Sequence, residues 1–330
     1  MQAITYSAFG PAGDVLKQAT LDTPEPGPGE VRVRLAFSAV NPSDVKARAG
    51  SRPGVTAPPY PRIIPHSDGA GVIEAVGAGV DYARIGEEVW IWNGQWQRAF
   101  GTAASHITLP AAQAVPLPPG IPLETGASLG IPGLTACHAV FGGGEIRDRC
   151  VLVQGGGGTV GLLAVQLAKW GGARVIATCS PGDRARVMQA GADVVLDYAA
   201  PDLSKAILEA NGGQEIDTII EVEFGHNVAQ DAAVIAANGR IAAFGSAKEM
   251  TPTLPFGPLL FKAVTIDILL IYLLPEAQRA AAIARLHAAL SDGALHCPVQ
   301  EVFALKDTAR AHEAVEAGGR TGAVLIDCSG

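Results

Sequence analysis

Apolar and polar residues alternate with two different periods along this chain. The odd-numbered residues from Val31 to Ala39 are all apolar, which is the period of a strand with one buried face. Shorter apolar runs at 71–76, 88–92 and 105–109 are separated by glycines. Many short strands with glycine turns predict a small barrel or sandwich in the first 124 residues. We expect residues 41–50 to form a loop with a helical turn.

After a proline-rich connector at 114–120, short apolar runs begin to alternate with stretches of helical periodicity. This alternation predicts an α/β fold with a parallel, doubly wound sheet and right-handed crossovers. A strand, a helix at 308–317 and a last strand at 323–327 close the chain. The expected strands are 151–153, 174–178, 193–196, 217–221, 240–244 and 264–269, and the expected helices are 182–190, 203–210, 227–237 and 276–290.

A glycine-rich stretch connects the first of these strands to a helix. Gly156, Gly158 and Gly161 follow the apolar run 151–153, and apolar residues then recur at helical spacing. A strand, a glycine turn and a helix bring backbone N–H groups up to a phosphate, and this spacing fits the dinucleotide fingerprint. The alternative is a plain glycine-rich turn between a strand and a helix.

Composition narrows the functional classes. The chain has 330 residues, enough for two domains, and a net charge of −8, which weighs against a nucleic-acid partner. No signal peptide is evident, and the longest apolar run, 263–274, is too short to cross a membrane. The five cysteines are scattered without C-x-x-C spacing, which favours reduced thiols. We expect a soluble, cytoplasmic protein without a membrane partner.

Five motifs together indicate a family, and they occur in the order typical of it. The chain resembles the zinc-independent quinone oxidoreductase (zeta-crystallin-like) branch of the medium-chain dehydrogenase/reductases. The resemblance covers essentially the whole chain. The motifs are NPSD at 41–44, SDGAGVIEAVG at 67–77, GIPGLT at 130–135, VLVQGGGGTVG at 151–161 and RTGAVLI at 320–326.

This resemblance implies a GroES-like β-barrel catalytic domain over 1–124, completed by about 298–330. A Rossmann domain over 125–297 would bind the cofactor, with the active site in the cleft between the domains. Members commonly form homodimers or homotetramers through their cofactor domains. The strand at 264–269 is expected at a sheet edge that is available for pairing.

The end of the second Rossmann strand indicates which cofactor is bound. An NAD site usually has an acidic residue there to hold the ribose 2′-hydroxyl, but this strand ends in Cys179 and Ser180, and Asp183 is the only acid near. Ser180 and Arg184 could instead hydrogen-bond a 2′-phosphate. The resemblance agrees and adds Tyr198, so we predict NADPH. The alternative for Arg184 is a solvated helix charge.

The resemblance also implies the remaining cofactor contacts. The pyrophosphate would lie over the glycine turn, the nicotinamide ribose near the loop after residue 243, and the carboxamide near backbone groups after residue 268. Thr135 would lie near the nicotinamide end, and Asn41 and Lys46 near the cofactor and substrate. The other residues are Gly157, Gly158, Thr159 and Val160 at the pyrophosphate, Phe244, Gly245 and Ser246 at the ribose, and Leu269, Leu270 and Ile271 at the carboxamide.

No metal is expected. Zinc-dependent relatives have a cysteine where this chain has Asn41, and a His-Glu pair where it has Ser67 and Asp68. His66 is one residue out of place, at a position that is commonly glycine in the quinone reductase branch. Two ligands without a cysteine do not make the usual three-ligand catalytic zinc site.

Without a metal, the protein has to position the cofactor and stabilise charge on the acceptor oxygen. Asn41 is the first candidate, as a hydrogen-bond donor to that oxygen or a ribose contact; the alternative is a turn cap before Pro42. Lys46 stands where many relatives have tyrosine, and would stabilise an anion, favour an acidic substrate or point to water. Tryptophans 90, 92 and 96 either line the substrate cleft or fill the barrel core.

These observations predict an NADPH-dependent reductase of quinones. The alternative is an NADPH-dependent double-bond reductase of enones, acrylates or enoyl thioesters, so that the partner is a small quinone or α,β-unsaturated carbonyl. A distant alternative is a crystallin-like RNA-binding or structural protein. The sequence leaves one- and two-electron reduction both open.

Overall fold

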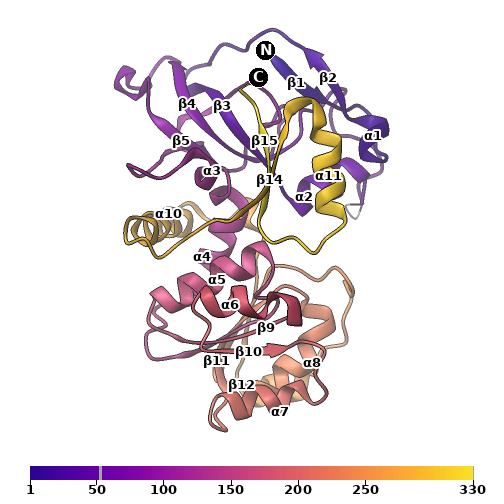
Figure 1. Ribbon diagram of the computed structural model, residues 1–330, viewed down its shortest axis with the longest axis vertical. Coiled ribbons are helices and arrows are strands. Elements are labelled where there is room, and N and C mark those ends of the chain that lie inside the picture. Colours follow the sequence, from indigo (N-terminus) through magenta and orange to yellow (C-terminus); the bar gives the residue numbers. More distant parts are fainter. Residues whose placement is uncertain (52–53, 330) are drawn as a thin grey trace. The chain divides into compact units, whose positions relative to one another are not determined.

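The computed structural model describes residues 1–51 and 54–329, which form two compact units (Figure 1). The first unit contains Met1–Ile131 together with Cys297–Gly330, and the second contains Pro132–His296. The sequence-based division placed these boundaries at 124 and 297. Each unit has its own sheet and core.

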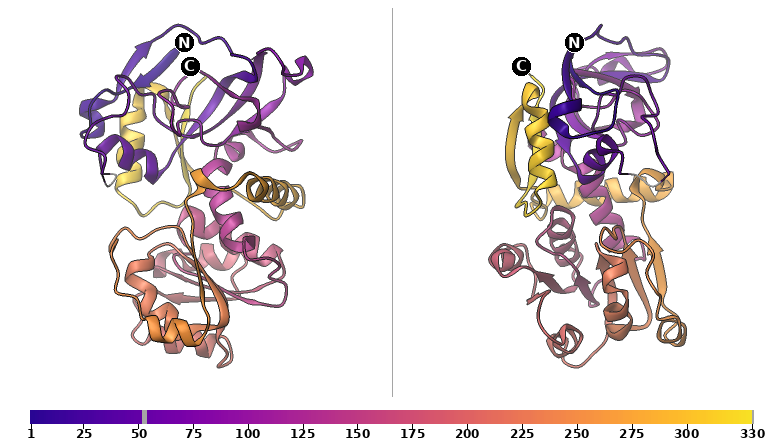
Figure 2. Two further views of the ribbon diagram at one scale, coloured as in Figure 1. Left: turned by 180° about the vertical axis from the view of Figure 1, so that it is seen from behind. Right: turned by 90° about the vertical axis from the view of Figure 1, so that its right-hand side faces the viewer.

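The first unit is built on a sheet in which the C-terminal segment joins N-terminal strands. The last strand pairs antiparallel with β3, so that the yellow C-terminal segment lies among the indigo and purple strands (Figure 2). The strands follow the order β14 (Val299–Ala304), β15 (Ala323–Asp327), β3 (Glu30–Val40), β4 (Asp68–Val76), β5 (Glu88–Ile91) and β7 (Ala114–Pro116), and β6 (His106–Pro110) also pairs with β3.

The predicted strand period is confirmed in the first part of β3, where Val31, Val33 and Leu35 are fully buried in the core of this unit. The period changes at an irregularity between Leu35 and Phe37, so that Phe37 is half-buried and Ser38 is buried. Helix α11 packs on β14 and β15 and also contacts α1 and α2. The remaining elements of the unit are β1 (Gln2–Thr5), β2 (Lys17–Thr20), α1 (Ala12–Val15), α2 (Pro42–Ala49), α3 (Leu123–Gly126) and α11 (Thr308–Glu316).

The second unit is a doubly wound parallel sheet, as predicted. Its order is β10 (Val194–Asp197), β9 (Arg174–Cys179), β8 (Cys150–Val153), β11 (Ile216–Glu221), β12 (Ile235–Ala243) and β13 (Thr265–Ile268), and every pairing is parallel. The order reverses between β8 and β11, which is where ligands of such sheets bind.

Helices cover both faces of this sheet because its strands are apolar on both sides. Leu152 and Ile176 pack with the helices α7 and α8 in one buried cluster. Val151 and Val175 alternate to the opposite face, where α5 packs against β8 and β9. The helices are α4 (Leu134–Phe141), α5 (Thr159–Trp170), α6 (Arg184–Gln189), α7 (Leu203–Ala210), α8 (Phe224–Val234), α9 (Phe256–Phe261) and α10 (Glu276–Ser291).

The expectation of a loop at 41–50 is wrong, because this segment forms the two-turn helix α2. Pro42 occupies its first turn, and the Asp44 carboxylate accepts a hydrogen bond from the Asn41 backbone N–H at 2.8 Å. Gly50 ends the helix in the left-handed conformation, with φ of 74°. Capping residues at both ends therefore define this helix, although its sequence has little apolar periodicity.

Two predicted helices have different bounds in the structure. The expected helix at 182–190 is divided into the short 3₁₀ turn η4 (Pro181–Asp183) and α6. The expected helix at 227–237 ends at Val234, and β12 begins at the next residue. None of the helices within residues 1–51 and 54–329 is long and apolar enough to cross a membrane.

The pairing of β15 with β3 predicts a large effect of Ile326→Ala. Ile326 is fully buried in the core of the first unit, so we expect its truncation to lower the free energy of unfolding by about 2–5 kcal/mol in urea denaturation. Val302→Ala, on exposed β14 surface (46% exposed), is the control and should change it by less than about 0.5 kcal/mol. Equal effects of the two variants would contradict the assignment of β15 to this core.

Candidate cofactor and catalytic sites

The glycine turn between β8 and α5 is shaped for a close backbone approach. A Cβ atom at Gly161 would overlap the carbonyl oxygen of Gly155, so that only glycine lets α5 pack this close to the turn. Gly155 itself has φ of 69°, which favours glycine. At Gly158 a Cβ would meet only the Gly155 oxygen, at 3.5 Å, and the turn is open on that side.

The N-terminus of α5 has hydrogen-bonding capacity to spare. No side chain of the described residues caps this helix, and the buried Oγ1 of Thr159 has no hydrogen-bond partner among them. The first N–H groups of a helix lack intrahelical acceptors and carry the positive end of its dipole. A phosphate group fits this combination of open backbone, unpaired donors and positive potential.

The other predicted cofactor residues of the second unit lie mostly at the same edge of the sheet. They follow β9, β10, β12 and β13, and the carboxyl ends of parallel strands share one edge. Thr135 is the exception, since it lies buried on α4. The residues at the edge are Ser180, Arg184, Tyr198, Phe244, Gly245, Ser246, Leu269, Leu270 and Ile271, together with the turn residues Gly157, Gly158, Thr159 and Val160.

The loops after β11 and β12 are tied to each other. Phe244 N–H donates to the Glu221 carbonyl at 3.0 Å, and Gly225 N–H donates to the Ser246 hydroxyl at 2.8 Å. Leu269 N–H donates to the Ala243 carbonyl at 2.8 Å. These hydrogen bonds fix the edge next to the point where the strand order reverses.

Arg184 is exposed, but its side chain has one fixed contact. Its Nη1 donates to the carbonyl of Val195 in β10 at 2.5 Å. Ser180 donates its hydroxyl proton to Asp183 at 2.7 Å. Tyr198 is 59% exposed, so its ring is accessible from solvent.

A buried carboxyl pair behind this edge was missed by the sequence analysis. Glu221 at the end of β11 and Asp231 on α8 are both fully buried, and the charge of Glu221 acts on Asp231. Gln154 donates to Asp231 at 3.3 Å and accepts from Thr178 at 2.7 Å. Burial raises the pKa of Glu221, and burial together with the charge of Glu221 raises the pKa of Asp231 well above its usual range.

In the first unit, Asn41 is fixed by a buried acid. Its Nδ2 donates to Asp68 Oδ2 at 2.8 Å, and the Ile131 N–H donates to the same oxygen at 2.8 Å. Burial, with a contribution from the charge of Asp44, raises the pKa of Asp68 well above its usual range, although the two donors oppose this. The other carboxyl oxygen, Oδ1, is buried and has no partner in the described part of the chain.

Helix α2 presents its two basic residues differently. Lys46 is exposed to solvent. Arg48 is buried and binds both the Glu316 carboxylate on α11 and the Gly10 carbonyl. Arg48 therefore anchors α2, and the exposed Lys46 remains available to a ligand.

His66 is buried in the first unit, where polar side chains contact both of its ring nitrogens. Its φ of 76° lies in the region that favours glycine. Its Nδ1 lies 2.9 Å from Ser38 Oγ and its Nε2 lies 2.8 Å from His312 Nε2. Burial lowers the pKa of His66 well below its usual value, and burial with the nearby charge of Arg48 lowers the pKa of His312 to about 3.

The direction of each hydrogen bond between Thr102, Ser38, His66 and His312 follows from the one bond whose donor is fixed. Thr102 donates to the Asp68 carbonyl at 2.6 Å, so its oxygen accepts from Ser38 at 2.8 Å. Ser38 in turn accepts from His66 Nδ1, which leaves His66 Nε2 to accept from His312. His66 is therefore neutral, and both of its nitrogens have hydrogen-bond partners.

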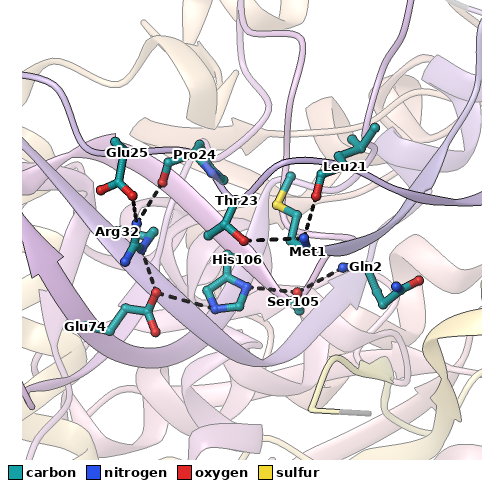
Figure 3. A network of polar contacts seen from close by, with 10 residues as sticks. All are labelled: Met1, Gln2, Leu21, Thr23, Pro24, Glu25, Arg32, Glu74, Ser105 and His106. Carbon is teal, nitrogen blue, oxygen red and sulfur yellow. Dashed lines mark hydrogen bonds and ion pairs between the residues drawn. The ribbon is translucent and has the colours of Figure 1, made fainter.

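Further polar and aromatic groups of this unit are structural. Figure 3 shows His106 between Glu74, at 3.4 Å, and Ser105, at 2.9 Å, with Arg32 on the far side of Glu74. Partial burial lowers the pKa of His106. Trp90 is fully buried, which favours the core-filling alternative for this tryptophan.

Comparisons with known proteins agree with this architecture. The family model "Alcohol dehydrogenase GroES-like domain" matches residues 27–119, and the model "Zinc-binding dehydrogenase" matches residues 159–288. The chain is 30% identical to a quinone oxidoreductase of Pseudomonas aeruginosa over 329 residues, which cover 98% of both chains. The chain belongs to the quinone oxidoreductase branch of the medium-chain dehydrogenase/reductases.

Solved structures place the protein in the same group. The Escherichia coli quinone oxidoreductase complexed with NADPH is 25% identical, covers 99% of this chain and 100% of its own, and has a TM-score of 0.85. A structure described as an NAD-dependent alcohol dehydrogenase is 31% identical, with 99% of both chains covered and a TM-score of 0.86. The protein is therefore an oxidoreductase of the medium-chain type with a GroES-like and a Rossmann domain.

In this chain, the residues at the positions of the zinc ligands of zinc-dependent relatives, and His66 next to them, make other contacts. Asn41 and Asp68 bind each other, and His66 binds Ser38 and His312. Within residues 1–51 and 54–329, no group of three or more His, Cys, Asp or Glu side chains could hold a metal ion. The cysteines are all free thiols.

The Glu221–Asp231 pair predicts a pH-dependent stability that Asp231→Asn removes in part. The folded protein favours the protonated form of the two carboxyl groups. Their contribution to stability is therefore fully present below their pKa values in the unfolded chain and is lost as the pH rises through their raised pKa values in the folded protein. The loss is about 1.4 kcal/mol for each unit by which a pKa is raised. The asparagine keeps a donor without titrating. We expect its free energy of unfolding, relative to wild type, to increase between pH 4 and pH 9.

The exposed Asp148→Asn variant is the control, since it removes the same charge from the same unit. Its difference from wild type should be nearly constant over this pH range. Urea denaturation at several pH values measures both variants. A constant difference for Asp231→Asn as well would show that the pair does not share a proton.

Proposed function

We propose that this protein is an NADPH-dependent reductase of quinones that transfers hydride without a metal ion. The observation that carries the proposal is the open glycine turn at the N-terminus of α5, where the buried Thr159 hydroxyl has no hydrogen-bond partner and no side chain caps the helix in the described structure. The relatives that match the whole chain include proteins named quinone oxidoreductases.

We propose contacts in the second unit for each part of the cofactor. Gly157, Gly158, Thr159 and Val160 would bind the pyrophosphate, and Ser180, Arg184 and Tyr198 would surround the 2′-phosphate. Thr135, Phe244, Gly245, Ser246, Leu269, Leu270 and Ile271 would position the nicotinamide half. NADPH itself would supply the hydride.

Asn41 and Lys46 are the proposed catalytic residues. One amide hydrogen of Asn41 is used by Asp68, so its second hydrogen or its Oδ1 would contact the acceptor oxygen or the cofactor ribose. Because Asp68 fixes the side chain, Asn41 would act without first being reoriented. Lys46 would stabilise negative charge that develops on the reduced acceptor.

Reduction of an activated double bond is the second candidate. The exposed ammonium group of Lys46 favours it, since an acrylate or an enoyl thioester with an acidic group would be attracted there. Enones lack this attraction and would be poorer substrates of the same reaction.

We also propose a homodimer or homotetramer formed through β13. This strand is at the edge of the parallel sheet, and its neighbourhood exposes large apolar side chains, with Ile268 78% exposed. An unpaired edge with apolar surface is the type of surface that pairs with a second copy.

The substrate proposal is tested by NADPH oxidation with a naphthoquinone, phenanthrenequinone, an enone and an acrylate. We expect the two quinones to be reduced faster than the enone and the acrylate. A preference for the acrylate that disappears in Lys46→Met would favour the second candidate. Inactivity with all four acceptors would contradict both.

Arg184→Ala tests the preference for NADPH. If Arg184 binds the 2′-phosphate, the KM for NADPH should rise about tenfold or more, since hydrogen bonds to charged groups are strong, whereas the KM for NADH should change little. Arg174→Ala, which removes an arginine from the opposite end of β9, is the control and should leave both values unchanged. Equal increases for the two cofactors would remove Arg184 from the phosphate site.

A further inference from the structure

Asp183 lies against the glycine turn, although it is not at the tip of a strand. The 3₁₀ turn η4 follows β9 and brings the side chain back, so that a Cβ atom at Gly157 would be 2.7 Å from Asp183 Oδ2. The acidic residue that holds the ribose in dinucleotide sites is found about 20 residues beyond the glycines. Asp183 has that distance in sequence and also contacts the turn.

Two neighbours hold the Asp183 carboxylate in place. Ser180 donates to Oδ2 at 2.7 Å, and Arg186 Nη2 donates to Oδ1 at 2.5 Å and to the Gly157 carbonyl at 2.7 Å. Partial burial would raise the pKa of Asp183, but the hydrogen bonds from Arg186 and Ser180 outweigh it and lower the pKa. The side chain is 31% exposed, so part of the carboxylate is accessible from solvent beside the glycine turn.

The hydrogen bonds of Ser180 and Arg184 leave fewer donors available to a 2′-phosphate. The hydroxyl proton of Ser180 is already donated to Asp183, and Nη1 of Arg184 is donated to the Val195 carbonyl. A phosphate would have to compete for Ser180 and would lie close to a carboxylate of like charge, which is unfavourable. A ribose 2′-hydroxyl, by contrast, can donate to that carboxylate.

We propose that Asp183 is a specificity-determining residue, which accepts the 2′-hydroxyl of NADH and opposes the 2′-phosphate of NADPH. The inference rests on the proposed function, in that a nicotinamide dinucleotide binds at this turn. Asp183 and Arg184 then act in opposite directions from adjacent positions, and the protein uses both cofactors. The preference for NADPH is smaller than Arg184 alone would produce.

Asp183→Asn tests the proposal by keeping the shape and removing the charge. The dissociation constants of NADH and NADPH are measured by cofactor fluorescence on the intact chain, without an acceptor. We expect NADPH to bind more tightly and NADH more weakly, with the ratio of the two constants shifting about tenfold towards NADPH. Asp183→Ala should shift it in the same direction, and Arg184→Ala in the opposite one.

Asp148→Asn is the matched control, because this exposed residue lies before β8, at the opposite end of the strand from the glycine turn. It should leave the ratio unchanged. A purely structural role of Asp183 would weaken both cofactors equally, and an unchanged ratio in both Asp183 variants would overturn the inference. If wild type binds neither cofactor, the proposed function fails instead.

Discussion

The close packing of α5 on the glycine turn is the contact on which the candidate cofactor site depends. It requires that Gly161 have no side chain, since any Cβ would overlap the Gly155 carbonyl. This contact sets the N-terminus of α5 at the carboxyl end of β8, beside the point where the strand order reverses. The loops after β9, β11, β12 and β13 then surround one open edge, and the Glu221–Asp231 pair connects that edge to the core behind it.

The sequence predicted the elements whose signal is local. The strands of the parallel sheet have apolar runs of their own, and the glycine turn has a fixed spacing, so both were found from the chain alone. Helix α2 was missed because Val45 is its main apolar anchor and its stability comes from its ends and from Arg48. The partner of Arg48 is Glu316, which is 268 residues away in the sequence. The periodicity of a short segment cannot predict such a contact.

The buried polar contacts could not be predicted for the same reason. His66 and His312 are 246 residues apart in the sequence. Asp231 lies on α8 and Glu221 at the end of β11, and only the packing of that helix on the sheet brings them together. For the Glu221–Asp231 pair, the one available signal in the sequence was a charged residue, Glu221, at the end of a buried strand. The structure confirms that β9 ends at Cys179 without an acidic residue, but the return of Asp183 to the glycine turn depends on the 3₁₀ turn, which was expected to be helix.

Several buried polar side chains of the first unit are hydrogen-bonded in one connected set. Thr102 donates to the Asp68 backbone while the Asp68 side chain holds Asn41, so that the histidine chain and the Asn41 contact meet at one residue. Buried polar groups without partners are costly, and this set gives Asn41 a single orientation. Hydrogen exchange of the intact protein with and without NADPH tests the central claim most directly. We predict slower exchange at residues 155–161 and 178–186, and unchanged exchange at residues 2–20. Saturating NADPH without protection of the glycine turn would contradict the account.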